Sequence, residues 1–208
     1  MGKDSDLNDI FNDVTSYLDE MDSIREKVLN FQRSSVRLCS EAIKKVHRNE
    51  WDQIDEKLEK AKKEYEKLEQ SLNRAPGDFQ KDYRTHAAQE LGEAIIFYNL
   101  IVNEKFPTPK ECGIREVDYP YALSDVIGEL KRYVLKSIRN EKVDRAFKLY
   151  DYMEEIYSHL FSLDYPGGLI PGLRRKIDIA RKILSKTEGD ITMSANIIKL
   201  NKNLDKHK

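Results

Sequence analysis

The chain has few of the residues that interrupt secondary structure. Its 208 residues include only nine glycines and six prolines, and a sandwich or barrel of many short strands would need more turn residues than this. Long apolar runs are also missing. The longest, residues 94–102, is interrupted by Asn99 and is far too short to cross a bilayer. These absences favour long helices, and we expect no association with a membrane.

Cysteine is scarce and neither sign of charge dominates. Cys39 and Cys112 are too few for a disulfide framework and have no metal-ligand spacing. The 36 basic and 37 acidic residues give a net charge of −1, so nucleic acid would have to bind a local patch or a surface created by assembly. The acidic N-terminus contains no apolar signal core. We therefore expect a cytoplasmic protein with reduced cysteines.

Helical periodicity is the main positive signal. Apolar residues recur at helical spacing over 5–47 without glycine or proline, and turn residues divide the rest of the chain. The predicted helices are 5–47, 51–73, 79–105, 118–140, 141–163 and 173–186. Gly189 is predicted to end the last one, leaving a frayed tail of about 15 residues. Without internal repeats or linkers, residues 1–208 are predicted to form one all-α domain, an antiparallel bundle of about six or seven helices.

Four acidic residues on two predicted helices are the strongest candidates for chemistry. Glu90 and Glu93 are three residues apart and share a helix face, and no lysine or arginine occurs between residues 87 and 103. Asp125 and Glu129 share a face of the next helix. Carboxylates on facing helices of a bundle can form a site of hard oxygen ligands, which suits Mg²⁺ or Mn²⁺.

A purely structural role for these acids is the alternative. Glu90 and Glu93 can pair with a lysine or arginine of another helix, and Glu129 can pair with Arg132 at i+3. The two readings predict different stabilities. If the carboxylates cluster, Asp125→Asn or Glu93→Gln relieves repulsion and leaves the metal-free protein no less stable. If they pair with buried cations, the same changes cost roughly 3–5 kcal/mol.

Basic side chains near the acids are candidates for binding phosphates. Those before Glu90 are Lys81, Arg84 and His86, and those after Asp125 on its own face are Arg132 and Lys136. Each is a weak signal alone, and His86 can equally be a solvent-facing histidine. Other catalytic motifs are absent, because the chain has no GxSxG elbow, P-loop, GxGxxG or HExxH.

Three segments together resemble the translin and translin-associated factor X family. They are QELGEAIIF, VDYPYALSDVIGELKR and YMEEIYSHLFSLDYPGGLIPGLRRKIDIARKILSK. The first is similar to the QE-x-x-EA pattern of the factor X branch, and the second to its VDY…D-x-x-GEL-x-R segment. The third looks like the family's late helix pair. The resemblance implies an all-α bundle that assembles into a closed, hollow homo-oligomer, with an octamer as the expected form.

The resemblance is greatest to the factor X branch, which implies a metal-dependent endoribonuclease acting on single-stranded RNA. Glu90, Glu93, Asp125 and Glu129 match the acidic positions of that branch. They would hold Mg²⁺ or Mn²⁺, with the first three catalytic and Glu90 the candidate general base. The alternative, as in translin, is a non-catalytic binder of single-stranded RNA or DNA. A third possibility is a helical scaffold. The resemblance to translin's own basic RNA-binding stretch is poor, and in this chain only Arg84 and His86 contribute to it.

Overall fold

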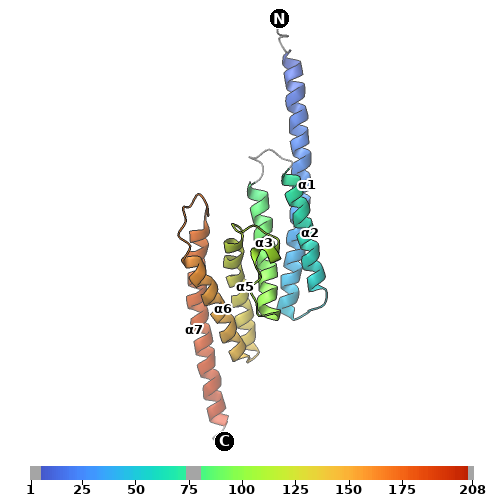
Figure 1. The fold of residues 1–208 in the computed structure, drawn as a ribbon. Coiled ribbons are helices and arrows are strands. Elements are labelled where there is room, and N and C mark those ends of the chain that lie inside the picture. Colours follow the sequence, from blue (N-terminus) through green and yellow to red (C-terminus); the bar gives the residue numbers. More distant parts are fainter. Residues whose placement is uncertain (1–5, 74–80, 206–208) are drawn as a thin grey trace.

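The computed structural model describes residues 6–73 and 81–205, and these residues form an all-α bundle without strands (Figure 1). The helices are α1 (Leu7–Arg48), α2 (Ile54–Leu72), α3 (Lys81–Val102), α4 (Pro109–Cys112), α5 (Tyr119–Arg139), α6 (Val143–Phe161) and α7 (Leu173–Asp205). The predicted fold class is confirmed. The turn predicted at residues 75–78 lies outside the described residues.

The first two helices form a hairpin whose turn the sequence predicted correctly. Helix α1 ends at Arg48, and its C-cap residue Asn49 has a left-handed conformation (φ 58°), with its N–H bonded to the carbonyls of Lys45 and Val46. Helix α2 returns along α1 and packs against it. Ser35 of α1 donates a 3.0 Å hydrogen bond to the Ala61 carbonyl of α2. The hairpin covers one side of the central helix α3.

Helix α3 lies between this hairpin and α5. Because neighbours surround it, only His86 and Val102 are exposed among residues 83–102, whose side chains the structure describes. Its fully buried side chains include Leu91, Ile96, Phe97 and Leu100. This position explains the absence of lysine and arginine over residues 87–103, where a charged side chain would lose its hydration. It also places Glu90 and Glu93 at the centre of the bundle.

A short helix, α4, lies in the segment between the predicted helices 79–105 and 118–140. Its N-cap is Thr108, whose hydroxyl accepts from the Glu111 N–H at 3.2 Å, while the Thr108 N–H donates to the Glu111 carboxylate at 2.7 Å. This reciprocal pair is a capping box, with Pro109 favourable at the first helical position. The TPKE sequence carries this signal, although the helices predicted from the sequence leave these residues in a loop.

Helix α7 corrects the predicted end of the bundle. It continues through Gly189 to Asp205, so the predicted stop and frayed tail are wrong for the described residues. One glycine costs a helix only about 1 kcal/mol relative to alanine. Thr187 and Ile191, on either side of it, are buried at 0% and 1% exposure, and this packing continues the helix. None of the described helices has the length and apolar character needed to span a membrane.

Candidate functional site

The two acidic helices, α3 and α5, approach each other closely at Gly92. A Cβ atom on this residue would lie 2.7 Å from Ala122 Cβ of α5 and 2.8 Å from Ile114 Cδ1. Real Cβ contacts are longer than this, so only glycine fits here without a shift of its neighbours. Gly92 lies between Glu90 and Glu93 in the sequence. The close approach therefore lies at the same level along α3 as these two acids, although residues one or two positions apart do not share a helix face.

The four predicted carboxylates lie near enough to perturb one another. Burial raises the pKa of Glu93 to about 8, and the charges of Asp125, Glu90 and Glu129 add to the rise. Burial also raises the pKa of Glu90, and Asp125 and Glu129 again contribute. Such shifts are typical of carboxyl groups that share a poorly hydrated site with like charges. The structure thus gathers acids from positions 90 to 129 into one cluster.

Glu90 and Glu93 are the unpaired half of this acidic cluster. Among the side chains that the structure describes, neither has a hydrogen-bonded or ion-paired partner. Both are only partly exposed, so their charges are incompletely hydrated. The nearest compensation for Glu90 is the electrostatic effect of exposed His86, which lowers its pKa against the larger effect of burial. The raised pKa values mean that these two carboxyl groups hold their protons to a higher pH than free glutamates do.

Asp125 and Glu129 are paired with side chains from distant helices. Lys176 Nζ of α7 lies 2.6 Å from the Asp125 Oδ1 atom, and His47 Nε2 of α1 contacts the Glu129 carboxylate. Arg132 is a weaker partner, with Nη1 3.7 Å from Glu129 Oε2. The Glu129–Arg132 pair expected from the i,i+3 spacing is therefore present, but His47 is the closer partner of Glu129. The structural alternative holds for this half of the cluster.

Sequence reasoning had missed His47 and Lys176. They lie 82 and 51 residues from the acids that they contact, so no local spacing connects them. Lys176 also corrects one stability expectation. Asp125→Asn should not be neutral, because the change would leave Lys176 without its carboxylate partner. Glu93→Gln keeps its expected outcome, because no described cation bonds to Glu93.

The cluster has the chemistry of a divalent metal site but not its coordination geometry. Carboxylate oxygens are the ligands that Mg²⁺ and Mn²⁺ prefer, and no described cation bonds to Glu90 or Glu93. Among the described residues, however, no three acidic, histidine or cysteine side chains are arranged to hold one ion. The ammonium of Lys176 already occupies the Asp125 carboxylate. To bind an ion through all four carboxylates, these side chains would have to move closer to one another. Lys176 would have to release Asp125, and His47 would have to release Glu129.

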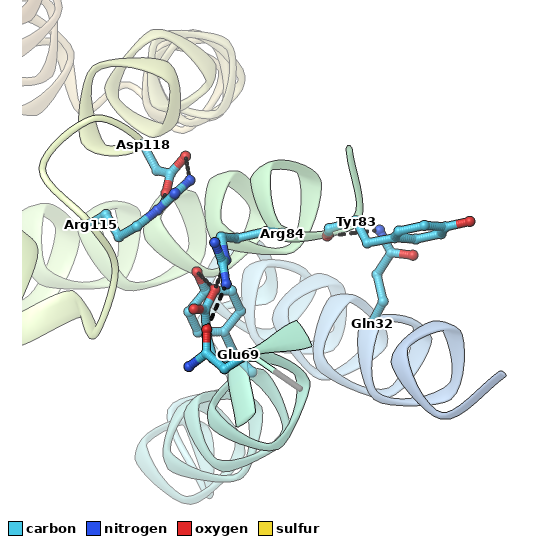
Figure 2. Close-up of polar contacts among 8 residues, drawn as sticks. Gln32, Glu69, Tyr83, Arg84, Arg115 and Asp118 are labelled. Carbon is cyan, nitrogen blue, oxygen red and sulfur yellow. Dashed lines mark hydrogen bonds and ion pairs between the residues drawn. The ribbon is translucent and has the colours of Figure 1, made fainter. Parts of the chain in front are cut away.

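Arg84, a predicted phosphate ligand, is used elsewhere in the structure. Figure 2 shows its guanidinium turned toward α2, where Nε lies 2.7 Å from Glu69 Oε1 and Nη2 lies 3.2 Å from Asn73 Oδ1. Its side chain is only 13% exposed. Gln32 of α1 donates to the nearby main-chain oxygen of Tyr83 at 3.3 Å. Arg84 therefore helps to join α3 to the hairpin and is not available to bind phosphate.

Asp118, where the sequence predicts the fourth helix to begin, immediately precedes α5. It is the N-cap residue, but its side chain makes no capping bond. Instead, its buried carboxylate accepts two hydrogen bonds from Arg115, at 2.7 and 3.0 Å (Figure 2). This pair stabilises the turn that leads into α5.

The other predicted basic residues lie on two sides of the acidic cluster. His86 and Lys176 line a cleft of about 570 Å³ between α3, α5 and the turn before α7. Arg132 and Lys136 line a second cleft, between α1 and α5. Lys81 begins α3, and its side chain lies outside the described part of the chain. The structure therefore places three of the five predicted phosphate ligands on clefts beside the acids.

Comparison with known proteins agrees with this fold. A sequence model of the Translin family matches residues 3–191. An uncharacterized protein of Methanocaldococcus jannaschii is 36% identical over 198 residues, which cover 94% of this chain and 87% of that protein. The family match extends through α3 and α5 and over residues 173–191 of α7.

Solved structures are similar over nearly the whole chain. AfC3PO in its complex with duplex RNA has a TM-score of 0.79 at 25% identity, covering 92% of this chain and 98% of its own. AfC3PO by itself also gives 0.79, at 26% identity and coverages of 90% and 97%. Apo-NeC3PO gives 0.77 at 21% identity and coverages of 91% and 99%, which shows a shared fold. From the family match, the relative and these structures together, we conclude that the chain belongs to the Translin family.

Proposed function

We propose that this protein is a metal-dependent endoribonuclease that cleaves single-stranded RNA within a homo-oligomer. The observation that carries the proposal is the acidic cluster, in which burial and mutual repulsion raise the pKa values of Glu90 and Glu93. Membership of the Translin family supports an RNA substrate. So does the similarity to AfC3PO, a protein whose structure contains duplex RNA.

Glu90, Glu93, Asp125 and Glu129 would hold Mg²⁺ or Mn²⁺. The ion, when bound, supplies a water of lowered pKa and stabilises the charge that develops on the phosphate. Glu93, with a pKa of about 8, keeps a proton at neutral pH in the metal-free protein and must release it to become a ligand. Glu90 is the better general base, because His86 partly offsets the rise in its pKa.

The clefts on either side of the acids would hold the phosphates that flank the scissile one. His86 lies on the first cleft, and Arg132 and Lys136 lie on the second. A strand that crosses from one to the other passes the acidic cluster. Contacts of this kind are electrostatic and give binding that weakens with salt. They bind a single strand of any sequence, because phosphates carry no base identity.

Incubation of a short end-labelled RNA with Mg²⁺ or with EDTA tests the proposal. We expect cleavage only with the metal, and none by Glu93→Gln. Glu56→Gln is a matched control, because Glu56 belongs to an ExxE pair of α2 but is exposed and paired with Lys60 at 2.6 Å. It should cleave like the wild type. Cleavage that continues in EDTA, or in Glu93→Gln, would contradict the proposal.

A non-catalytic RNA-binding protein is the second candidate, and one observation favours it. Lys176 and His47 already pair with Asp125 and Glu129, so half of the acidic cluster is neutralised without a metal. Retention of RNA without cleavage at any Mg²⁺ concentration would establish this function. A duplex RNA of the same sequence belongs in the assay, because AfC3PO has been solved with a duplex. Equal binding of both forms would contradict a preference for single strands.

The homo-oligomer is supported by apolar surface that the single chain leaves uncovered. The N-terminal half of α1 projects from one end of the molecule and α7 extends from the other (Figure 1). Six apolar side chains on the projecting part of α1 are between 45% and 65% exposed: Leu7, Ile10, Phe11, Val14, Tyr17 and Leu18. Their spacing follows the heptad pattern of a helix that packs against another helix. We propose that the homo-oligomer is an octamer, as the family resemblance implies.

Charge indicates which surface of a second copy covers these six apolar side chains, the α1 stripe. All charged residues from 6 to 24 are acidic, whereas residues 174–186 of α7 include six basic residues and one acidic residue. Two acidic α1 segments would repel each other if they paired. Helix α7 also has exposed apolar side chains of its own, including Ile179, Met193 and Ile197. We therefore place the α1 segment of one copy against α7 of the next.

A further inference from the structure

One face of α5 changes from acidic to basic along the helix. Asp125 and Glu129 are followed by Arg132, Lys136 and Arg139 at steps of four, three, four and three residues. These steps keep all five on one side of the helix. A helical turn advances about 5.4 Å, so the three cations extend over roughly two turns beyond the acids. The basic part of this face therefore extends along α5 from the acidic cluster toward the C-terminal end of the helix.

The C-terminal end of α1 completes a cleft with this basic face. The cleft has a volume of about 540 Å³ and is lined by His47, one leucine and five cations, which are Lys44, Arg48, Arg132, Lys136 and Arg139. No carboxylate is among the lining residues. In a protein whose net charge is −1, this is a strong local concentration of positive charge. A cleft lined with one sign of charge attracts and holds polyanions.

Lys136 lies at the inner side of this cleft and has no acidic partner among the described residues. Its ammonium donates to the main-chain oxygen of His47 and lies 5.1 Å from the centre of the Tyr133 ring. Burial, and then the charges of Arg139 and Lys142, lower the pKa of Lys136. A bound anion would offset both effects. A lysine in these surroundings is suited to bind a phosphate as a point charge.

Another cleft, of about 680 Å³, adjoins this basic cleft between α1 and α5 and shares Lys136 with it. It contains Trp51, which is the single tryptophan of the chain and is 45% exposed. Tyr133 also lines it, but its ring already packs against Phe97, with centroids 6.1 Å apart. Trp51 is therefore the aromatic side chain with a surface available for stacking. The lining adds the cation Lys142, whereas the guanidinium of Arg145 is already paired with Glu104, with Nη1 2.8 Å from Oε1.

We propose that these adjoining clefts bind one strand of nucleic acid, with successive phosphates between α1 and α5 and a base stacked on Trp51. Cations that follow the backbone, together with an exposed aromatic ring, are how proteins hold single strands without reading sequence. A duplex would leave no unstacked base for Trp51. The site deepens the proposed function, since the strand leads along α5 toward the acids. It binds a strand whether or not those acids cleave it.

Trp51 is also the probe that tests this proposal. The full-length protein is titrated in EDTA, so that cleavage does not intervene, with an oligouridylate of about ten nucleotides. We expect saturable quenching of the tryptophan fluorescence and a loss of affinity as salt increases. Trp51→Ala has no tryptophan, so its affinity is measured by anisotropy of a labelled strand and should fall about fivefold or more. Trp51→Phe, which keeps a ring, should recover much of that loss.

Charge reversal in the cleft is compared with the same change elsewhere. Lys44→Glu combined with Arg139→Glu should weaken binding at least tenfold and reduce its salt dependence. Lys60→Glu combined with Lys63→Glu, on the exposed surface of α2, makes an equal charge change and should have much less effect. Circular dichroism establishes that both variants are folded. Equal affinities of the two double variants would overturn the proposal.

The outcomes separate this proposal from the nuclease proposal. If Glu93→Gln loses cleavage but still quenches Trp51, both proposals are supported. If the wild type quenches but never cleaves, the clefts bind and the nuclease proposal fails. If RNA is cleaved but Trp51 does not respond and the Lys44 and Arg139 changes are silent, the clefts are not the path of the strand. If those changes alter only the mass of the assembly, the clefts are an interface between copies, and the proposal is again wrong.

Discussion

At the scale of single residues, the acidic cluster is an unequal set of four carboxyl groups. Asp125 and Glu129 have partners, whereas Glu90 and Glu93 have none among the described side chains. The paired acids meet basic side chains from other helices, His47 of α1 and Lys176 of α7, whereas no described cation bonds to Glu90 or Glu93. The unpaired acids should therefore respond to pH, and the paired ones should respond to the removal of their partners.

Glu93→Gln should change how stability depends on pH. The folded protein raises the pKa of Glu93 from 4.5 to about 8, so between these values the folded state binds more protons than the unfolded state. The free energy of unfolding then decreases as pH rises through this window. Glutamine cannot titrate, so the decrease should be smaller by roughly 1–3 kcal/mol. Urea unfolding in EDTA at pH 5 and pH 8.5 measures this, and an unchanged pH dependence would contradict it.

Asp125→Asn, unlike Glu93→Gln, should lower the free energy of unfolding. It removes the partner of Lys176, and because both side chains are about one-third exposed, the cost should be only about 1 kcal/mol. A double-mutant cycle with Lys176→Met isolates the interaction. We expect the two changes to be less than additive in urea unfolding at pH 7. Full additivity would mean that the ion pair contributes nothing to stability.

At the scale of helices, Gly92 determines how closely α3 and α5 pack. Gly92→Ala should destabilise the protein by about 1–3 kcal/mol, because its Cβ atom would overlap Ala122 and Ile114. Gly128→Ala in α5 is the matched control, since nothing lies within 4 Å of its Cβ position. It should stabilise the protein by up to about 1 kcal/mol through helix propensity. Thermal unfolding compares the two, and an equal gain in both would show that α3 and α5 are not in close contact.

Helix positions were more predictable from the sequence than the partners of the site. Apolar periodicity located α1 to within two residues, because each turn of a packed helix must present apolar side chains to a neighbour. The end of α7 was missed because Gly189 is a local signal that packing of the flanking residues overrides. The spacing of the acids on α3 and α5 was visible, whereas the approach of His47 and Lys176 depends on how distant helices pack.

At the scale of the whole molecule, the two projecting ends should hold copies together. Asp9→Lys combined with Asp13→Lys should weaken self-association, because the acidic side chains beside the α1 stripe would no longer attract the basic α7. Lys182→Glu combined with Lys186→Glu on α7 should do the same. Mixing the two double variants should restore association, since each then offers the charge that the other lacks.

Light scattering at micromolar concentration follows the assembly. The wild type should have a mass well above twice the 24.3 kDa of one chain. A wild-type mass of 24.3 kDa would contradict the assembly itself. If the α1 variant instead associated more strongly with wild-type chains, two α1 segments would be pairing, and the proposed contact with α7 would be wrong.

The central claim is that the carboxylates of α3 and α5 form a metal site, and thermal unfolding with and without Mn²⁺ tests it most directly. An ion that binds only the folded protein stabilises it by mass action. The wild type and Glu56→Gln should therefore gain several degrees in Tm when Mn²⁺ is added, and Glu93→Gln should gain little or nothing. Without metal, Glu93→Gln should melt no lower than the wild type. Equal Mn²⁺ shifts in all three proteins, or a large loss of Tm in Glu93→Gln with wild-type cleavage, would contradict the metal site.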